Sequence, residues 1–326
     1  MKGRSAGGTA SGVALDSPDT ATPPYSARSL PFKVIRPRRD TLRAMTWRRL
    51  TGAGELGVGD VLGPYRLEKL LGEGGMGLVF RAVREGEETP VALKLLKVDL
   101  SGDETYKRRF IHEARSAAEV THKHLVPILD AGEIDGRYYL AVGYVQGETV
   151  EERIQLKGPL PLDDVLRLAT EVGSGLDALH ASGVVHRDIK ASNLLIDESG
   201  ATLLTDFGLA KGRAYTALTK LGQVLGTLDY LAPELIRGEP ATPASDIYAL
   251  GCTIYECIAG KPPFGDKTML QVGIAHLEEE PADPGAGRDD WSPELFGAVL
   301  RALAKDPAQR PATAGAFASM LQVAAQ

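Results

Sequence analysis

The hydrophobic pattern of the chain changes character at about residue 147. Before that point, short apolar stretches rich in β-formers alternate with Gly and polar turns, which is typical of strands in an antiparallel sheet. One helical segment interrupts them, "GDETYKRRFIHEARSAAEVTH". The predicted strands are "YRLEKLLGEG", "GLVFRAVRE", "TPVALKLLKV" and, as a hairpin of two, "LVPILDAGEIDGRYYLAVGYV".

The pattern after Gly147 is helical. "PLDDVLRLATEVGSGLDALHASG" places apolar residues on one helix face: Val165, Leu168, Ala169, Val172, Leu176 and Leu179. "PASDIYALGCTIYECIAG" is a mostly apolar helix that we expect to be surrounded by protein, and "SPELFGAVLRALAKDP" and "TAGAFASMLQVAA" are typical of amphipathic closing helices. We therefore predict an α+β fold with a small β-rich lobe over residues 59–147 and a larger, mainly helical lobe over residues 148–326. The cleft between two such lobes is the expected place for a ligand.

Residues 1–58 differ from both lobes. The stretch is rich in Gly, Ser, Thr, Ala and Pro, has no hydrophobic period, and cannot bury enough apolar surface to offset its chain entropy. We expect a disordered tail, and Met45 is a possible alternative start. Its basic run is either a solvated segment or an electrostatic docking segment for lipid or an acidic partner, and both readings stay open. The run consists of Lys33, Arg36, Arg38, Arg39, Arg43, Arg48 and Arg49.

Composition narrows the class of protein. The chain has 326 residues, of which 43% are hydrophobic and 25% charged, and its net charge of −6 argues against nucleic-acid binding. We expect no membrane span, since no window reaches ~18 consecutive apolar residues. The N-terminus lacks the apolar core of a signal peptide, so a cytoplasmic location is expected. Cys252 and Cys257 lie five apart in a predicted helix and point in different directions, so we expect free, buried thiols.

A glycine-rich turn is the first candidate for chemistry. "LLGEGGMGLVF" spaces Gly72, Gly74 and Gly77 as G-x-G-x-x-G, which alone is weak evidence. In a dinucleotide-binding fold the motif would open a helix and be followed by an acidic residue. Here the following residues favour a strand, and Lys94 of "VALK" comes next. A strand, a glycine turn, a second strand and a strand lysine is an arrangement that covers nucleotide phosphates.

Lys94 is flanked by apolar residues, so we expect it to point into a partly dry cleft rather than to lie on a wet surface. A lysine in that position needs a counter-charge. Glu113, on the helical segment that follows, is the predicted partner of Lys94.

Two further motifs complete an ordered set. "HRDIKASN" occupies residues 186–193 and "TDFG" residues 205–208, followed by "APE" and a late Arg310. With the glycine turn, "VALK" and Glu113, these motifs make the sequence resemble the eukaryotic-type (Hanks-type) protein kinases, in their bacterial serine/threonine branch, over residues 60–326. The resemblance implies a two-lobed, protein-kinase-like fold.

The resemblance also implies a reaction, transfer of the γ-phosphoryl group of ATP to protein hydroxyls. Asp188 would accept the proton or hydrogen bond of the substrate hydroxyl, and Lys190 would neutralise charge on the transferred group. Asn193 and Asp206 would hold Mg²⁺ through oxygen ligands. Lys94 would hold the phosphates. The ATP-binding residues that the resemblance implies are Leu71, Gly72, Gly74, Gly75, Gly77, Val79, Ala92, Lys94, Gly143, Val145 and Leu195, with Val142 as gatekeeper.

In the family, a lysine at position 190 and a threonine at position 227 accompany serine/threonine specificity, so the expected partners are proteins with Ser/Thr acceptors. A second copy of the chain is a further possible partner, in a homodimer for trans-autophosphorylation. Two alternative functions remain. A pseudokinase usually lacks Lys94, Asp188 or Asp206, and a small-molecule phosphotransferase generally lacks the "APE" segment and Thr227; all of these are present here.

The resemblance implies two structural roles and one switch. Glu234 of "APE" would form a buried ion pair with Arg310. Asp246 would brace the catalytic loop, which is the segment that carries "HRDIKASN". We further expect Thr219, or else Thr216, to be autophosphorylated. Its phosphate would then bind Arg187, Lys211 and Arg109.

Overall fold

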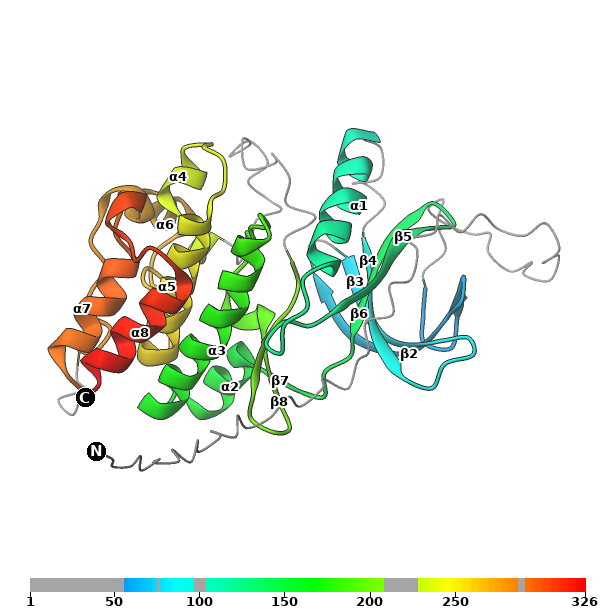
Figure 1. Cartoon of the computed structure of the whole chain (residues 1–326), viewed down its shortest axis with the longest axis horizontal. Coiled ribbons are helices and arrows are strands. Elements are labelled where there is room, and N and C mark those ends of the chain that lie inside the picture. The colour runs from blue at the N-terminus through cyan, green and yellow to red at the C-terminus, as the bar shows by residue number, and fades with distance from the viewer. Residues whose placement is uncertain (1–55, 75–76, 97–103, 208–227, 287–290) are drawn as a thin grey trace, which may run out of the picture.

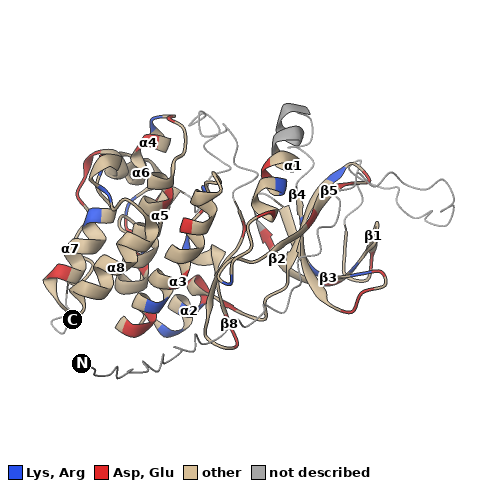
Figure 2. Cartoon of the chain, viewed as in Figure 1, with Lys and Arg blue, Asp and Glu red and all other residues tan. Residues whose placement is uncertain are grey.

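The computed structural model in Figure 1 describes residues 56–74, 77–96, 104–207, 228–286 and 291–326. Nearly all of the predicted tail therefore lies outside the described residues. The two predicted lobes are both present and lie side by side, the sheet lobe on the right of Figure 1 and the helical lobe on the left. Acidic and basic residues occur in both lobes in the view of Figure 2.

The small lobe is built on an antiparallel sheet of six strands in the order β1-β2-β3-β4-β6-β5. All of the predicted strands of this lobe are confirmed, and the short β1 is an addition to them. The helical segment predicted between β4 and β5 forms α1, Glu104–Ala118. The strands are β1 Val61–Leu62, β2 Tyr65–Gly74, β3 Gly77–Arg84, β4 Pro90–Leu96, β5 Ile128–Ile134 and β6 Arg137–Gly143.

Alternation along the strands sorts the side chains of this sheet into two apolar clusters. Val91, Leu93 and Leu95 of β4 pack within the small lobe itself. Ala92 and Leu96 pack instead into the cluster that continues through the helical lobe. Because strand side chains alternate between faces, Lys94 shares the face of Ala92 and Leu96. The strand pattern thus directs Lys94 toward the side on which the second lobe lies.

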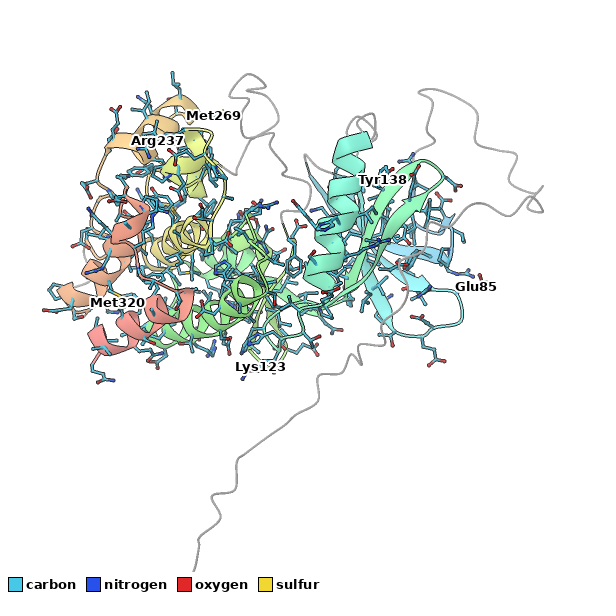
Figure 3. The ribbon with its side chains drawn as sticks, turned by 45° about the horizontal axis from the view of Figure 1, so that its top comes forward. Glu85, Lys123, Tyr138, Arg237, Met269 and Met320 are labelled. Atoms are coloured by element: carbon cyan, nitrogen blue, oxygen red, sulfur yellow. The ribbon has the colours of Figure 1, made fainter. Side chains whose placement is uncertain are left out.

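The helix α1 is fastened to the sheet by an aromatic contact. The rings of Phe110 in α1 and Tyr138 in β6 meet edge to face with their centres 6.2 Å apart. Tyr138 is labelled in Figure 3, where it lies beside the ribbon of α1. Ala114 and Ala117 of the same helix are buried, so α1 presents small residues to the core and holds Glu113 at the boundary between the two lobes.

The large lobe confirms the four predicted helices, which are α3, α5, α7 and α8. Every residue of α5 from Ser245 to Ile258 is buried, as expected for a helix surrounded by protein. It begins at Pro243 after the capping residue Thr242 and ends at Ala259, followed by the capping residue Gly260, whose φ of +79° suits glycine. The helices are α2 Val150–Lys157, α3 Leu162–Ala181, α4 Pro233–Ile236, α5 Pro243–Ala259, α6 Met269–Glu278, α7 Pro293–Ala302 and α8 Ala314–Ala324.

A second, smaller sheet was not predicted. Its three antiparallel strands are β7 Gly147–Thr149, β8 Leu194–Asp197 and β9 Thr202–Leu204. A Cβ on Gly147 would lie 2.0 Å from the carbonyl oxygen of Ile196, so β7 can approach β8 this closely only as glycine. The β8–β9 hairpin separates "HRDIKASN" from "TDFG" and thereby brings the two motifs to the same end of the sheet.

The cysteine prediction is confirmed. Cys252 and Cys257 are free and fully buried in α5, and burial raises the pKa of both thiols. Within the described part of the chain, no helix combines the length and apolar character needed to cross a bilayer.

The predicted ion pair of Glu234 and Arg310 is also confirmed. The guanidinium donates two hydrogen bonds of 2.8 Å to the two carboxylate oxygens, and both side chains are at least 95% buried. Burial alone would raise the pKa of Glu234, but hydrogen bonds from Arg310 and Ser245 hold it below its ordinary value. Arg310 also stacks over the ring of Tyr248, 4.8 Å from its centre.

Replacing Arg310 with Met should lower the free energy of unfolding by about 3–5 kcal/mol, because Glu234 would be left buried without compensation. Urea denaturation measures this. The matched control is Arg301→Met on the exposed side of α7, for which we expect a change within about 0.5 kcal/mol. The double variant Glu234→Met with Arg310→Met should recover part of the loss. Equal effects of the two arginine variants would contradict the assignment.

The buried His276 should make folding depend on pH. Burial, and then the charge of Lys305, lower the pKa of this imidazole from 6.5 to about 3. Between these values the unfolded chain binds a proton that the folded chain does not, so stability falls as the pH decreases through this range. The loss attributable to His276 between pH 7 and pH 5 is about 2 kcal/mol. His276→Gln should flatten the pH dependence of urea denaturation by this amount, and an unchanged slope would contradict it.

Candidate active site

The residues predicted to carry chemistry lie on three segments. Lys94 is in β4 of the small lobe, Asp188, Lys190 and Asn193 lie between α3 and β8, and Asp206 follows β9. Lys94 and Asp206, 112 residues apart in the sequence, form an ion pair. This ion pair joins the small lobe to the segment that follows β9. We call the region where these three segments meet the lobe junction.

Hydrogen bonds connect the rest of the set. Asn193 donates through Nδ2 to the Asp188 carbonyl at 2.7 Å and to the Asp188 carboxylate at 3.0 Å. The Lys190 ammonium lies 3.4 Å from the same carboxylate. The N–H of Thr205 donates to the carbonyl oxygen of Asn193 at 3.0 Å, which places Asp206 next to Asn193. All of these residues therefore belong to one contiguous network.

The catalytic segment is held by Asp246 of α5, as the sequence predicts. One carboxylate oxygen accepts from the N–H of His186 and the other from the N–H of Arg187, both at 2.8 Å. His180 also bonds Asp246, at 2.8 Å, and this contact was not anticipated, since nothing in the spacing of "HASGVVHRD" marks it. Asp246 is 1% exposed, so these bonds compensate a buried charge.

Two residues of the site adopt a left-handed backbone. Arg187 has φ of +68° and Asp206 has φ of +60°, a region that is unfavourable for residues other than glycine. The bond from the Arg187 N–H to Asp246 helps to hold the first of these turns. The ring of His186 packs against Phe207 with centres 5.3 Å apart and its Nε2 lies 3.2 Å from the Thr205 carbonyl, so the segment before the second turn is also fixed. Burial lowers the pKa of His186 and keeps it neutral.

The predicted ion pair between Lys94 and Glu113 is wrong in this structure. Lys94 contacts Asp206, and Glu113 accepts a hydrogen bond of 2.7 Å from the guanidinium of Arg187. The reason is geometric. Lys94 of β4 meets Asp206, the second residue after β9, whereas the side chain of Arg187, which has a left-handed backbone, extends to Glu113 of α1. Several charges meet at the lobe junction, and sequence spacing alone did not indicate which of them would pair.

The glycine turn joins β2 to β3, and Gly75 lies outside the described residues. A Cβ on Gly77 would lie 1.8 Å from the carbonyl oxygen of Leu95, so glycine lets β3 pass directly against β4. A Cβ on Gly72 would meet nothing within 4 Å, which leaves open space beside the backbone. Gly74 pairs with Gly77 across the turn, and Leu71 is 39% exposed near it.

The other predicted ATP-binding residues lie on neighbouring strands. Val79 pairs with Lys94, and Ala92 pairs with Val142 at the end of β6. Gly143 is the last residue of β6 and pairs with Val91. Ala92 and Val145 of the small lobe and Leu195 of β8 are all partly buried against the same apolar cluster. The structure thus brings members of this set from both lobes onto one cluster.

The predicted switch falls outside what the structure describes. Thr216, Thr219, Lys211 and Thr227 lie outside the described residues, and so does the side chain of Arg109. The described residues that follow this segment, Leu228–Tyr230, form a short turn of helix. Tyr230 and Leu231 line a small hollow of about 10 Å³ together with Asp188, so the described end of the segment lies beside the catalytic loop.

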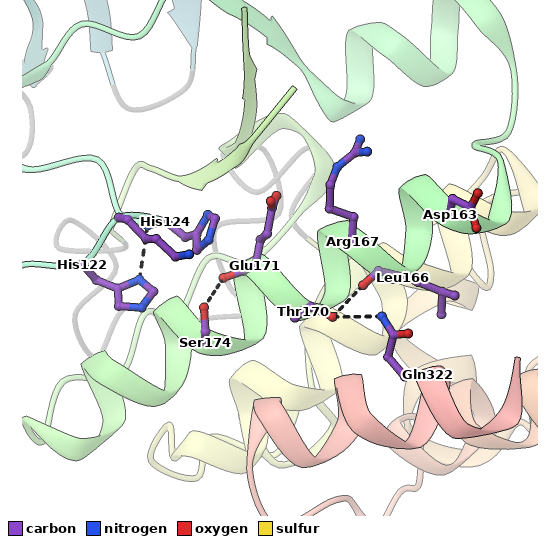
Figure 4. A pocket seen from close by; sticks show the side chains of 10 residues that line it. His122, His124, Asp163, Leu166, Arg167, Thr170, Glu171, Ser174 and Gln322 are labelled. Carbon is purple, nitrogen blue, oxygen red and sulfur yellow. Dashed lines mark hydrogen bonds between the residues drawn. The ribbon is translucent and has the colours of Figure 1, made fainter. Parts of the chain in front are cut away.

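A separate hollow of about 670 Å³ lies along α3 (Figure 4). It contains none of the predicted site residues. His122 accepts a hydrogen bond of 3.2 Å from the His124 N–H, and Gln322 of α8 donates to Thr170. In the described parts of the chain, no group of three or more His, Cys, Asp or Glu side chains could hold a metal ion. The lining residues are His122, Lys123, His124, Asp163, Leu166, Arg167, Thr170, Glu171, Ser174 and Gln322.

Comparisons with known sequences agree with this geometry. The protein kinase domain model matches residues 65–322. Serine/threonine-protein kinase PknE of Mycobacterium tuberculosis is 40% identical over 268 residues, which cover 82% of this chain and 47% of PknE. Serine/threonine-protein kinase PknH of the same species is 38% identical over 270 residues, covering 82% of this chain and 43% of PknH. The chain thus spans about half the length of these curated relatives.

Solved structures agree as well. The crystal structure of the M. tuberculosis PknI kinase domain superposes with a TM-score of 0.70 at 31% identity, covering 83% of this chain and 99% of that one. A second crystal structure of the same domain gives a TM-score of 0.69 at 30% identity. The predicted two-lobed fold is confirmed, and the family model covers well over half of the chain. The chain belongs to the protein kinase family, in its bacterial serine/threonine branch.

Proposed function

We propose that this protein transfers the γ-phosphoryl group of ATP to serine and threonine hydroxyls of other proteins. The observation that carries the proposal is the single contact network of Lys94, Asp188, Lys190, Asn193 and Asp206 at the lobe junction. The relatives named above are serine/threonine-protein kinases, which supports the same reaction. Lys94, Asp188 and Asp206, the residues of which pseudokinases usually lack at least one, are all present.

Asp188 is the proposed acceptor of the substrate proton. Its carboxylate is 6% exposed and is oriented by the amide of Asn193 and the ammonium of Lys190. As the serine or threonine oxygen bonds to the γ-phosphorus, its proton moves toward Asp188 and ADP leaves. Lys190, 3.4 Å from that carboxylate, is placed to neutralise charge on the transferred group.

The residues at the junction fit Mg²⁺ and ATP. Asn193 commits its Nδ2 to Asp188, which leaves the amide oxygen as the atom available to a metal. The Asp206 carboxylate supplies a second hard oxygen, the ligand type that Mg²⁺ prefers. Mg-ATP, when bound, supplies the phosphoryl group and much of the charge neutralisation. Lys94 is the proposed phosphate ligand, and the open backbone at Gly72 leaves room for phosphate oxygens.

Activation is proposed to proceed by an exchange of partners at Arg187. Arg187 now binds Glu113 of α1 at 2.7 Å. A phosphate on Thr219, or else on Thr216, carries more charge than a carboxylate and binds a guanidinium through two parallel bonds. It would take Arg187 from Glu113 and release Glu113 to pair with Lys94. The exchange would order the activation segment and align α1 in a single step.

Asp188→Asn should abolish phosphoryl transfer while preserving shape, with a loss of about 10²–10⁴-fold expected for removal of a general base. The assay incubates each protein with labelled ATP and a cell lysate and identifies labelled serine and threonine. Asp163→Asn, on the exposed first turn of α3, is the matched control and should keep full activity. If Asp188→Asn labelled itself as well as the wild type, the role of Asp188 would be wrong.

Phosphopeptide mapping after incubation with Mg-ATP should find Thr219 or Thr216 modified. Thr219→Ala should then lower substrate phosphorylation in the wild-type background but cause little further loss in Arg187→Met, because both changes remove the same contact. The exchange at Arg187 would be refuted by two independent, additive losses, or by a map in which neither threonine is phosphorylated.

A further inference from the structure

In the small lobe, a cation–π contact joins β3 to the segment that follows β6. The guanidinium carbon of Arg81 in β3 lies 5.4 Å from the ring centre of Tyr144, the first residue after β6. We propose that Arg81 is a positioning residue for ATP, and that it acts by holding the glycine turn and the Gly143–Val145 segment at a fixed separation. The proposal rests on the proposed kinase function. We call the group formed by Glu68, Arg81 and Tyr144 the roof clamp.

Strand register explains why Arg81 reaches Tyr144. Arg81 pairs with Ala92 of β4, and Ala92 pairs with Val142 of β6, so the three residues form one row across the sheet. The alternate residues Phe80 and Ala82 pack into the cluster on the other face. Arg81 therefore shares the face of Val79, Ala92 and Lys94. Because the central residue of the row is alanine, the long arginine side chain can pass over it toward Tyr144.

A bulge in β2 holds the guanidinium from the other side. Leu67 pairs with Ala82 and Lys69 pairs with Arg81, so Glu68 is the extra residue of an irregularity in the ladder. Bulges redirect side chains, and Glu68 here forms an ion pair with Arg81. Both side chains are about one-third exposed (33% for Arg81 and 34% for Glu68), a setting in which an ion pair adds little to stability. The main effect of this ion pair is therefore to orient the guanidinium of Arg81, rather than to stabilise the fold.

The position of the roof clamp suggests what it controls. The two strands β2 and β3 carry the glycine turn that is proposed to cover the phosphates, and Tyr144 lies between Gly143 and Val145, two of the residues proposed to bind ATP. The roof clamp therefore links two parts of the small lobe that are proposed to bind ATP. Asp188 and Asn193, which are proposed to act in the transfer step, belong to the other lobe. Loss of the roof clamp should weaken nucleotide binding without slowing the transfer step, which raises KM and leaves kcat unchanged.

The test compares Arg81→Met with Arg84→Met in kinase assays at varied ATP concentration. Arg84 is the last residue of the same strand and has its own acidic neighbour, Glu87 at 3.6 Å. We expect Arg81→Met to raise the KM for ATP by about 3–10-fold with kcat within about two-fold, and Arg84→Met to change neither. Tyr144→Leu should raise KM similarly. The double variant Arg81→Met with Tyr144→Leu should exceed the larger single effect only slightly, since both remove one contact.

Calorimetric titration with Mg-ADP separates this inference from the proposed function. A weaker affinity of Arg81→Met for Mg-ADP supports the roof clamp whether or not the protein transfers phosphate, whereas a wild type that binds Mg-ADP but labels no protein overturns the kinase proposal alone. The roof clamp is overturned if Arg84→Met weakens binding as much as Arg81→Met does. It is also overturned if Arg81→Met lowers kcat with KM unchanged, or if the effects of Arg81→Met and Tyr144→Leu add fully.

Discussion

A buried carboxylate is the constraint on which the site depends. Asp246 is 1% exposed, inside a helix that is itself surrounded by protein, and an isolated charge there would be very unfavourable. It is accommodated because it accepts hydrogen bonds from His180, His186 and Arg187. Those bonds in turn hold Arg187 in a backbone conformation that it would otherwise avoid. The burial of one side chain in α5 thus determines the shape of the catalytic loop.

The same constraint reaches the second lobe. Once the turn at Arg187 is fixed, its side chain extends to Glu113 of α1, while Asp206 meets Lys94 of β4. Two ion pairs therefore cross the lobe junction, and each joins one residue of the small lobe to one of the large lobe. Both are partly buried, with side-chain exposures between 16% and 30%, so their charges are screened less than those of surface pairs. The relative placement of α1 and the catalytic loop follows from these contacts.

Most of the longer strands and helices could be predicted from the sequence, because their apolar residues recur at a regular spacing. The strands between Tyr65 and Leu96 and the apolar face of α3 are confirmed, since burial of one face enforces the pattern. The strands of the second sheet, β7 to β9, escaped prediction because three or four residues are too few to show a period. The pairing of Lys94 escaped for another reason: Glu113 and Asp206 both lie near the junction, and their distances depend on how the lobes pack. The contact of Arg81 with Tyr144 could not be predicted, since a lone arginine in a strand sequence is typical of a solvated surface.

Charge balance at the lobe junction bears on how the site can work. Three cations among the described residues of the junction contact a carboxylate: Lys94 contacts Asp206, Arg187 contacts Glu113, and Lys190 contacts Asp188. An anionic ligand must therefore compete with a carboxylate for every cation that it uses. In the proposed function Asp206 would resolve this competition, because its carboxylate would turn to Mg²⁺ and release Lys94 to a phosphate. Metal and nucleotide binding would then be coupled through Asp206, which is the counter-charge of Lys94 until that exchange takes place.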